Sequence, residues 1–418
     1  MIKKILLNIL LYMLIFGSTP IFAQPSIEAP TGILMDGTTG QILYEKNCDE
    51  TFYPASTTKI LTALLFMENV AMDEILTVNE DVPNLIEQGS SQIYLIPGEQ
   101  LTGEQLLNAL MIESANDAAV VIAQHISGNV EEFGKLMTKR AKELGAVNSN
   151  FTNPNGLHDD NHYTTAKDMA LILQKVIKYP ALTEIMTRRN YVIPETAYQD
   201  TRYLWTKNKL LQSSQNNFYN ENVIASKTGY TTKAGNALVT AAKKDDLTLI
   251  TVVLNCIGTM TYNDTNAMLE FGFNGFKRIE LLNNNQLLKT IQIGKDNLDL
   301  ISSQEFSYTI PKNESETIES EIFLPDEISL PLEKGESVGK IVYTFNGSEI
   351  GAVDLLAATA ISKPFSFLGI LKTIFLIFIL FLFIIYIGLR LYVERKNRII
   401  RQRKALRNRK TRNEYSKF

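Results

Sequence analysis

Cysteine, histidine and tryptophan are scarce in this chain. Its 418 residues include two cysteines, three histidines and one tryptophan. Cys48 and Cys256 are too few for a disulfide framework and lack the spacing of a zinc site. We expect both to be small buried hydrophobic residues. A single bridge between them stays open, because bridge geometry cannot be read from a sequence.

A basic surface is also missing from most of the chain. Overall, 41 Lys and Arg residues stand against 45 Asp and Glu, a net charge of −4. Residues 390–418 hold 12 of the basic residues, and Lys3 and Lys4 lie near the N-terminus, so the stretch between them carries −16. We therefore expect no nucleic-acid partner. The apolar fraction of 45% is typical of globular proteins, and the length allows two folded domains.

Two apolar segments indicate export and a membrane anchor. Residues 1–23 have the layout of a signal peptide: two lysines, an apolar stretch, and a small residue, Ala23, after which we expect cleavage. An uncleaved N-terminal anchor is the alternative. Residues 365–389 are almost wholly apolar and long enough to cross about 30 Å of hydrocarbon, so they are expected to form one transmembrane helix.

The basic segment 390–418 follows this span directly. The positive-inside rule therefore places it in the cytoplasm and places the region before the span outside the cell membrane. We interpret the tail as a topology signal that lies against anionic lipid, rather than as a site for a specific partner.

The exported region has two textures. Residues 24–277 mix helices and strands, whereas residues 278–360 contain short alternating runs separated by Asn, Pro and Gly, which predict a small all-β domain. Thr165 and Asp168 resemble a capping box at the start of a helix. In the first region the patterns predict a hairpin of 32–35 with 41–44, helices over 57–67, 101–126, 165–177 and 267–276, and strands over 223–227, 236–240 and 247–254.

Three short motifs occur in chain order. Ser56-Thr57-Thr58-Lys59 opens a predicted helix, Ser114-Ala115-Asn116 follows a helical stretch, and Lys227-Thr228-Gly229 ends a predicted strand. Each motif alone is common by chance. Their order and structural settings together predict a serine enzyme that works without histidine.

The spacing of the first motif suggests the chemistry. Ser56 and Lys59 share one helix face, so a neutral Lys59 amine can take the proton of the Ser56 hydroxyl. Burial and a second cation, Lys227, would lower the pKa of Lys59. Ser114 would relay the proton to a leaving amine, and Asn116 would hold Lys59 or a substrate amide.

The third motif suits substrate recognition. The charge of Lys227 and the hydroxyl of Thr228 suit a carboxylate, and Gly229 lets an extended peptide lie along the strand edge. The backbone N–H groups of Ser56 and Tyr230 would form an oxyanion hole.

These motifs, with Thr152-Asn153-Pro154-Asn155-Gly156-Leu157 and residues 162–170, resemble the low-molecular-weight penicillin-binding proteins of peptidase family S11. Those proteins are serine-type D-alanyl-D-alanine carboxypeptidases. The resemblance implies a mixed α+β, β-lactamase/transpeptidase-like fold with a five-stranded antiparallel sheet flanked by helices, followed by the small β domain.

The resemblance also implies a function. Ser56 would be the acylated nucleophile and Lys59 the general base, in an enzyme that removes the terminal D-alanine from peptidoglycan stem pentapeptides. β-Lactams would be inhibitors, and neither a cofactor nor a metal is expected. For the base that activates the deacylating water, Lys59 is our expectation.

The chain departs from the family pattern at three places. Ala225-Ser226 stands where relatives often have Gly followed by Ile or Leu, and the preceding segment 212–222 is rich in Asn and Ser. Thr261 stands where relatives often carry an arginine, so carboxylate binding would depend on Lys227 and Thr228. Many relatives anchor by an amphipathic helix instead of a full span.

Other readings are weaker. A class A β-lactamase needs an E-x-x-L-N segment after S-x-N, but here Glu104 to Asn108 precede Ser114. A non-catalytic cell-wall docking module would typically have lost a motif residue. Transpeptidation differs only in the acceptor of the acyl group, which no residue decides.

The remaining rare residues have structural interpretations. His158 and His162 lie in a loop without the Glu of H-E-x-x-H, so a metal site is not expected. We expect His125 to be a hydrogen-bonded histidine of the core or its boundary. We expect Trp205 to pack a loop near the K-T-G strand, and the family resemblance also allows it to contact the substrate.

Overall fold

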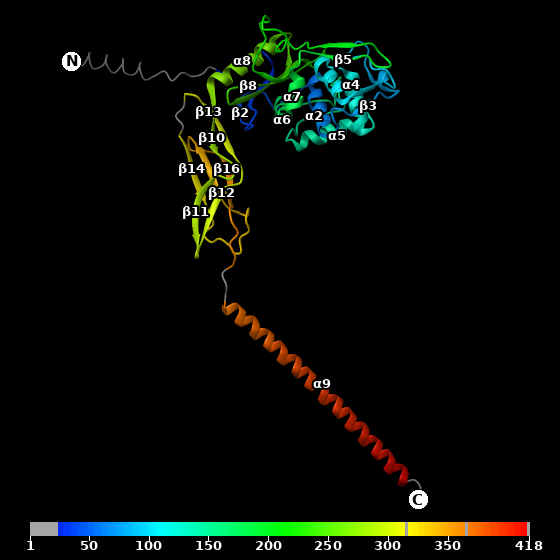
Figure 1. The fold of residues 1–418 in the computed structure, drawn as a ribbon, viewed down its shortest axis with the longest axis vertical. Helices are drawn as coiled ribbons and strands as arrows, with labels where there is room; N and C mark the ends of the chain where they lie inside the picture. The colour runs from blue at the N-terminus through cyan, green and yellow to red at the C-terminus, as the bar shows by residue number, and fades with distance from the viewer. Residues whose placement is uncertain (1–23, 314–316, 364–366, 416–418) are drawn as a thin grey trace, which may run out of the picture. The chain divides into compact units, whose positions relative to one another are not determined.

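The computed structural model describes residues 24–313, 317–363 and 367–415, so the expected signal peptide lies outside the described residues. Figure 1 shows the elements along the chain. The chain divides into two compact units. The first contains the described residues up to Gln286 with 304–321 and 342–353, and the second contains 287–303, 322–341 and the residues from Asp354 on.

A five-stranded antiparallel sheet forms the centre of the first unit. Its strand order is β2-β1-β9-β8-β7, which leaves β7 at an edge. The predicted hairpin and the three predicted strands are confirmed. β7 continues beyond Gly229, however, so the K-T-G motif lies within the strand and not at its end. The strands are β1 (Thr31–Asp36), β2 (Ile42–Lys46), β7 (Val223–Thr231), β8 (Gly235–Lys244) and β9 (Leu247–Cys256).

Both faces of this sheet are buried, and alternate residues of its strands supply two separate cores. Ile33 and Met35 of β1 belong to one core, whereas Leu34 belongs to the other. This alternation follows from the two-residue period of a strand. The first core includes α2 (Lys59–Asn69), α4 (Asn116–Ser127), α5 (Val130–Glu143) and α6 (Ala166–Val176), and the second includes α8 (Met260–Gly275).

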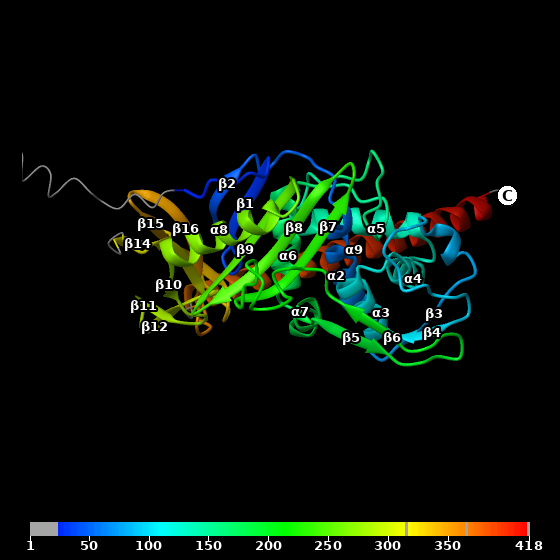
Figure 2. The ribbon, with the colours of Figure 1, turned by 90° about the horizontal axis from the view of Figure 1, so that it is seen from above.

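Helices α2, α4 and α5 gather beside the sheet in both views (Figures 1 and 2). α2 is preceded by the 3₁₀ turn η1 (Ala55–Thr58), which contains Ser56. The prediction that the Ser56 motif opens a helix is therefore confirmed. The sequence patterns missed α5 and α7 (Pro180–Thr187). At α6, Thr165 caps the helix by accepting from Asp168 N, but the Asp168 carboxylate accepts from Ser149 Oγ, so the reciprocal bond of a capping box is not recorded.

The single helix predicted over 101–126 is wrong. It is divided into β4 (Gln100–Thr102), α3 (Gly103–Asn108), a π turn η3 (Ala109–Glu113) and α4. Ser114 interrupts the run because its backbone is left-handed, with φ 64° and ψ 32°. Hydrophobic periodicity does not register one left-handed residue between two buried helices.

Short hairpins and a second sheet complete the strands. β3 (Ile75–Thr77) pairs with β4 and is followed in the chain by the 3₁₀ turn η2 (Val82–Leu85). β5 (Asn190–Ile193) pairs with β6 (Arg202–Trp205). Trp205 is 61% exposed, so the prediction that it packs a loop is wrong.

The remaining strands form a pair and a second sheet. β10 (Phe276–Leu282) pairs with β13 (Phe306–Pro311). The second sheet has the strand order β11 (Leu287–Ile293), β12 (Asp296–Ser302), β16 (Ser348–Ala357), β15 (Ser337–Phe345) and β14 (Ile318–Phe323). The predicted all-β texture is confirmed.

The C-terminal helix α9 spans Phe367–Tyr415. It is long and apolar enough to cross a membrane, as predicted. The helix also continues through the described part of the basic segment, which sequence reasoning did not predict. Cys48 and Cys256 are both buried and both free, so the expected burial is confirmed and no bridge joins them.

Candidate active site

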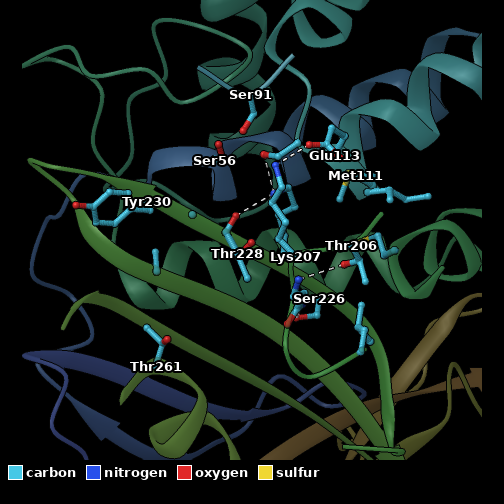
Figure 3. Close-up of a pocket in the computed structure, with 18 of the residues that line it drawn as sticks. Ser56, Ser91, Met111, Glu113, Thr206, Lys207, Ser226, Thr228, Tyr230 and Thr261 are labelled. Atoms are coloured by element: carbon cyan, nitrogen blue, oxygen red, sulfur yellow. Dashed lines mark hydrogen bonds and ion pairs between the residues drawn. The ribbon is translucent and has the colours of Figure 1, made fainter. Parts of the chain in front are cut away.

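The first motif lies where η1 passes into α2. Ser56 is in the 3₁₀ turn, and Lys59 is the first residue of α2. Because three residues complete one turn of a 3₁₀-helix, the two side chains lie on one face. Lys59 Nζ is 2.9 Å from Ser56 Oγ. The predicted contact between them is therefore present, and Ser56 lines the pocket shown in Figure 3.

Lys59 is fully buried and has two further acceptors. Its Nζ donates to Asn116 Oδ1 and to the backbone carbonyl of Asn155, both at 2.7 Å. A neutral amine has two N–H bonds and one lone pair. With the two amide oxygens taking the N–H bonds, the lone pair faces Ser56 Oγ, which would then donate its proton to the amine.

The surroundings of Lys59 favour this neutral form. Burial lowers its pKa well below the ordinary value, and the nearby charge of Lys227 lowers it further, whereas Asp117 raises it. The pKa of Lys227 is itself lowered to about 7 by burial and by Lys207, with Glu113 acting in the opposite direction. The expected effect of a second cation on Lys59 is thus present.

The second and third motifs meet in the same pocket as Ser56. Lys227 Nζ donates to Ser114 Oγ at 2.9 Å and to the carbonyl of its neighbour Thr228 at 2.9 Å. Ser114 is held there by its left-handed backbone, which follows the π turn. Left-handed non-glycine residues and π turns are both frequent at functional sites.

Asn116 and Asp117, which follow Ser114, hold the loop of residues 91–95 in place. Asp117 is buried, and its carboxylate accepts from the backbone N–H groups of Ile93 and Leu95 at 3.0 Å each. Asn116 N donates to the carbonyl of Ser91 at 2.8 Å. Ser91, which lines the pocket, is therefore positioned by the same segment that holds Asn116 against Lys59 (Figure 3).

Two glycines allow the backbone to close around Lys59. A Cβ at Gly229 would lie 2.9 Å from Pro54 O and 3.1 Å from Ser56 N, so strand β7 packs directly on the serine turn. A Cβ at Gly156 would lie 1.8 Å from Ala55 O, and the φ of Gly156 is +82°. No other residue type fits at this second position, which directs the Asn155 carbonyl to Lys59.

These residues surround a cavity of about 320 Å³. Ser56, Ser114 and Lys227 lie in it together with Thr228, Gly229 and Tyr230 from β7. Figure 3 shows Tyr230 on one side of Ser56 and Lys207 on another. Tyr230 is 64% exposed, at the open end of the strand. Thr261, at the start of α8, also lines the cavity.

An ion pair stands on the rim. Lys207 Nζ lies 2.6 Å from Glu113 Oε1, and both residues line the cavity. The pair links the segment before the Asn-rich loop to the residue preceding Ser114. Asn208 Nδ2, next to Lys207, donates to Ser226 Oγ at 2.8 Å. Leu211, the residue before the Asn- and Ser-rich segment 212–222, also lines the cavity, so this segment begins at the site.

The histidines take structural positions. His162 is buried, and Thr152 N donates to its Nδ1 at 3.2 Å, so its Nε2 carries the proton and donates to Thr58 Oγ1 at 2.9 Å. Burial lowers the pKa of His162 to about 4. His125 pairs with Glu74 at 2.8 Å at the surface boundary, as expected. Among the described residues, no group of His, Cys, Asp and Glu is arranged to hold a metal ion.

All eight residues proposed from the sequence lie at or beside this cavity. Ser56, Ser114, Lys227, Thr228, Gly229 and Tyr230 line it, and Lys59 and Asn116 lie behind Ser56. Sequence reasoning missed the Asn155 carbonyl, Asp117 and the Lys207–Glu113 pair. Only the Asn-Pro-Asn-Gly motif gave a signal for the first of these. The motif indicates a turn but not the contact with Lys59, because a backbone carbonyl that acts through its position has no signature of its own.

Comparison with known proteins gave concordant matches. Residues 19–258 match the family model described as D-alanyl-D-alanine carboxypeptidase, and residues 276–363 match the model of the penicillin-binding protein 5 C-terminal domain. The D-alanyl-D-alanine carboxypeptidase DacF of Bacillus subtilis is 36% identical over 360 residues, covering 82% of this chain and 88% of that protein.

Two further relatives agree with these matches. The D-alanyl-D-alanine carboxypeptidase DacC of Escherichia coli is 31% identical, covering 81% of this chain and 87% of its own length. The crystal structure of penicillin-binding protein 5 from Haemophilus influenzae is similar with a TM-score of 0.72 at 29% identity, covering 82% of this chain and 99% of that one.

Proposed function

Because the chain belongs to the D-alanyl-D-alanine carboxypeptidase family of penicillin-binding proteins, we propose that it trims peptidoglycan stem pentapeptides through an acyl-enzyme on Ser56. A serine acyl-enzyme is general to this family. The observation that carries the assignment to Ser56 is the position of Lys59 Nζ, which lies 2.9 Å from Ser56 Oγ and 2.7 Å from both Asn116 Oδ1 and the Asn155 carbonyl. In the neutral amine the two amide oxygens would accept its two N–H bonds, which leaves the lone pair for Ser56.

Acylation begins with that pair. Ser56 Oγ attacks the carbonyl carbon of the penultimate D-alanine as its proton passes to the Lys59 amine. Negative charge develops on the carbonyl oxygen. The N–H groups of Ser56 and Tyr230 are proposed to stabilise it, because Gly229 brings strand β7 against the serine turn.

Collapse of the tetrahedral intermediate releases the terminal D-alanine. Its nitrogen must gain a proton as the C–N bond breaks, and Ser114 is proposed to deliver one on the side facing Lys227. Ser114 would regain the proton that Lys59 took from Ser56, so that Lys59 returns to the neutral amine and no net proton is gained or lost over the step. Lys227 and Thr228 are proposed to bind the carboxylate of the departing D-alanine, with Thr261 on the same wall of the cavity.

Hydrolysis of the acyl-enzyme completes the reaction. Water adds to the ester carbonyl while Lys59, neutral again, accepts one of its protons, and the Ser56 oxygen leaves and is reprotonated. The products are D-alanine and the shortened stem peptide. A β-lactam would acylate Ser56 by the same first step, because its strained amide carbonyl takes the place of the scissile one.

We also propose the topology. The signal peptide would comprise residues 1–23, the catalytic domain 24–277, the β domain 278–360, the membrane span 365–389 and the cytoplasmic tail 390–418. The orientation follows from the 12 basic residues after the span. The catalytic domain would then face the cell wall, where its substrate lies.

The first test is D-alanine release from diacyl-L-Lys-D-Ala-D-Ala by the detergent-solubilised full chain, beside Ser56→Ala. We expect release by the wild type and none by the variant, and a fluorescent penicillin should label only the wild type. Labelling without release would contradict the proposed substrate. Neither labelling nor release by folded wild-type protein would contradict the catalytic proposal.

A further inference from the structure

A second cavity is lined by residues that lie close in the chain to Ser56 and Tyr230. Its volume is about 270 Å³. Three aromatic residues, Phe52, Tyr53 and Tyr163, line it together with residues that carry hydrogen-bonding side chains. The full lining is Thr51, Phe52, Tyr53, Asp160, Tyr163, Lys233, Ala234 and Asn255. The mechanism proposed above uses none of them.

The aromatic wall of this cavity is held in place. Phe52 and Thr164 form a pair of backbone hydrogen bonds of 2.8 and 2.9 Å, which fixes Phe52 beside Tyr163. The ring of His158 stands edge-on to Tyr53 with centroids 4.6 Å apart. His158 Nε2 in turn lies 3.3 Å from Asp160 Oδ1. A prearranged site of this kind binds with little ordering cost.

The polar wall comes from the ends of the sheet. Lys233 and Ala234 lie in the turn between β7 and β8, and Asn255 lies near the end of β9. Lys233 and Asn255 are both exposed, so their side chains have donors and acceptors available to a ligand. Aromatic faces beside a carboxylate, an amide and an ammonium group match a ring that is apolar on its face and carries hydroxyl and amide groups at its edge.

Two chain segments place the cavity near Ser56. Phe52 precedes Ser56 by four residues, and Lys233 follows Tyr230 by three, so the backbone path from the site is at most about 14 Å along either segment. The direction in which the substrate extends from the active site follows from the proposed carboxylate-binding residues. If the terminal carboxylate binds at Lys227 and Thr228, the acyl part of the substrate leaves past Tyr230, toward Lys233.

The length of the substrate matches this path. Beyond the acylated residue of a stem pentapeptide, three residues precede the sugar that carries the peptide, and extended residues span about 3.4 Å each. Counting the acylated residue itself, four residues separate the scissile bond from the sugar, which would therefore arrive roughly 14 Å from that bond. From this, and resting on the proposed function, we propose that the cavity lined by Phe52, Tyr53 and Tyr163 binds the amino sugar to which the stem peptide is attached.

The test compares two substrates that differ in the sugar. One is N-acetylmuramyl pentapeptide, and the other is the same pentapeptide with an acetylated N-terminus. We expect kcat/KM of the full-length wild type to be about tenfold higher for the first. Tyr163→Ala should remove this preference, because the substitution deletes an aromatic face but keeps the backbone bonds of Tyr163 to Asn150.

Controls separate the sugar site from the catalytic site. Tyr203→Ala, at a 67% exposed tyrosine of β6, should retain the preference. In Tyr163→Ala and Tyr203→Ala, the rates of penicillin acylation and of hydrolysis of the sugar-free peptide should stay within twofold of wild type. If Tyr163→Ala does not fold, Lys233→Ala provides a second test of the sugar preference. Equal kcat/KM of the wild type for both substrates, or an equal loss for both in Tyr163→Ala, would overturn the proposal. Hydrolysis of neither by the wild type would instead overturn the proposed function.

Discussion

The proton-accepting role of Lys59 can be tested by giving it a charged neighbour of unchanged shape. Asn116→Asp replaces one amide oxygen that accepts from Lys59 Nζ at 2.7 Å by a carboxylate oxygen. At that distance and an effective dielectric constant of about 20, attraction between unit charges is roughly 6 kcal/mol. The cost of burying the new carboxylate offsets part of it.

What remains corresponds to a pKa shift of about 1 to 3 units, the range seen for an opposite charge at close contact. The pKa of Lys59 should rise by that amount. At and below the wild-type pKa, the neutral fraction should be about 10- to 1,000-fold smaller than in the wild type, and this difference should shrink as the pH rises toward the new pKa. Ser56 acylation should fall in proportion, since only the neutral amine can take the proton.

The assay is the second-order rate constant for acylation by a fluorescent penicillin, measured from pH 6 to 10. The ratio of variant to wild type cancels the titration of groups that both proteins share, Lys227 included. We expect this ratio to rise about tenfold per pH unit until the new pKa is reached. Asn116→Ala should instead give a ratio that does not depend on pH. A pH-independent ratio for Asn116→Asp would refute the role of neutral Lys59.

Two further predictions concern packing and stability. Gly156→Ala should abolish penicillin labelling and lower Tm, because the new Cβ would collide with Ala55 O; Gly145→Ala, with similar φ but its nearest contact at 3.7 Å, should label normally. Folding lowers the pKa of His162 from 6.5 to about 4, so as the pH falls the unfolded chain takes up the His162 proton at a higher pH than the folded protein does. Unfolding free energy measured in urea should therefore drop by about 3 kcal/mol between pH 6.5 and 4. His162→Gln should remove most of that drop and His125→Gln should not; an unchanged slope in His162→Gln would contradict the assignment.

The sequence predicted the parts of the site that depend on local spacing. The three-residue interval from Ser56 to Lys59 places both on one face of any helical turn, so their contact needed no tertiary information. The strand that carries Lys227 was likewise visible from its apolar run. Strand ends were less certain. The position of Gly229 inside β7 follows from pairing with β8, which no local pattern records.

The rest of the site depends on contacts between distant segments. Ser114 adopts a left-handed conformation that the apolar sequence around it does not suggest, and the prediction of one helix over 101–126 failed there. The Asn155 carbonyl reaches Lys59 across 96 positions of sequence. Trp205 was expected to pack a loop near the K-T-G strand, yet in β6 it is exposed to solvent. In each case tertiary pairing, not local preference, decided the outcome.

The hydrogen-bonding partners of the buried cations explain why Lys59 can act as a base. Arg202, largely buried, is paired directly with the carboxylate of the buried Glu99. Lys59 is buried more completely but contacts only neutral oxygens. Asp117, the carboxylate whose charge raises the pKa of Lys59, accepts hydrogen bonds from the N–H groups of Ile93 and Leu95. A direct Asp117–Lys59 pair would have kept the amine protonated, so the backbone bonds to Asp117 serve the chemistry by holding that carboxylate away from the base.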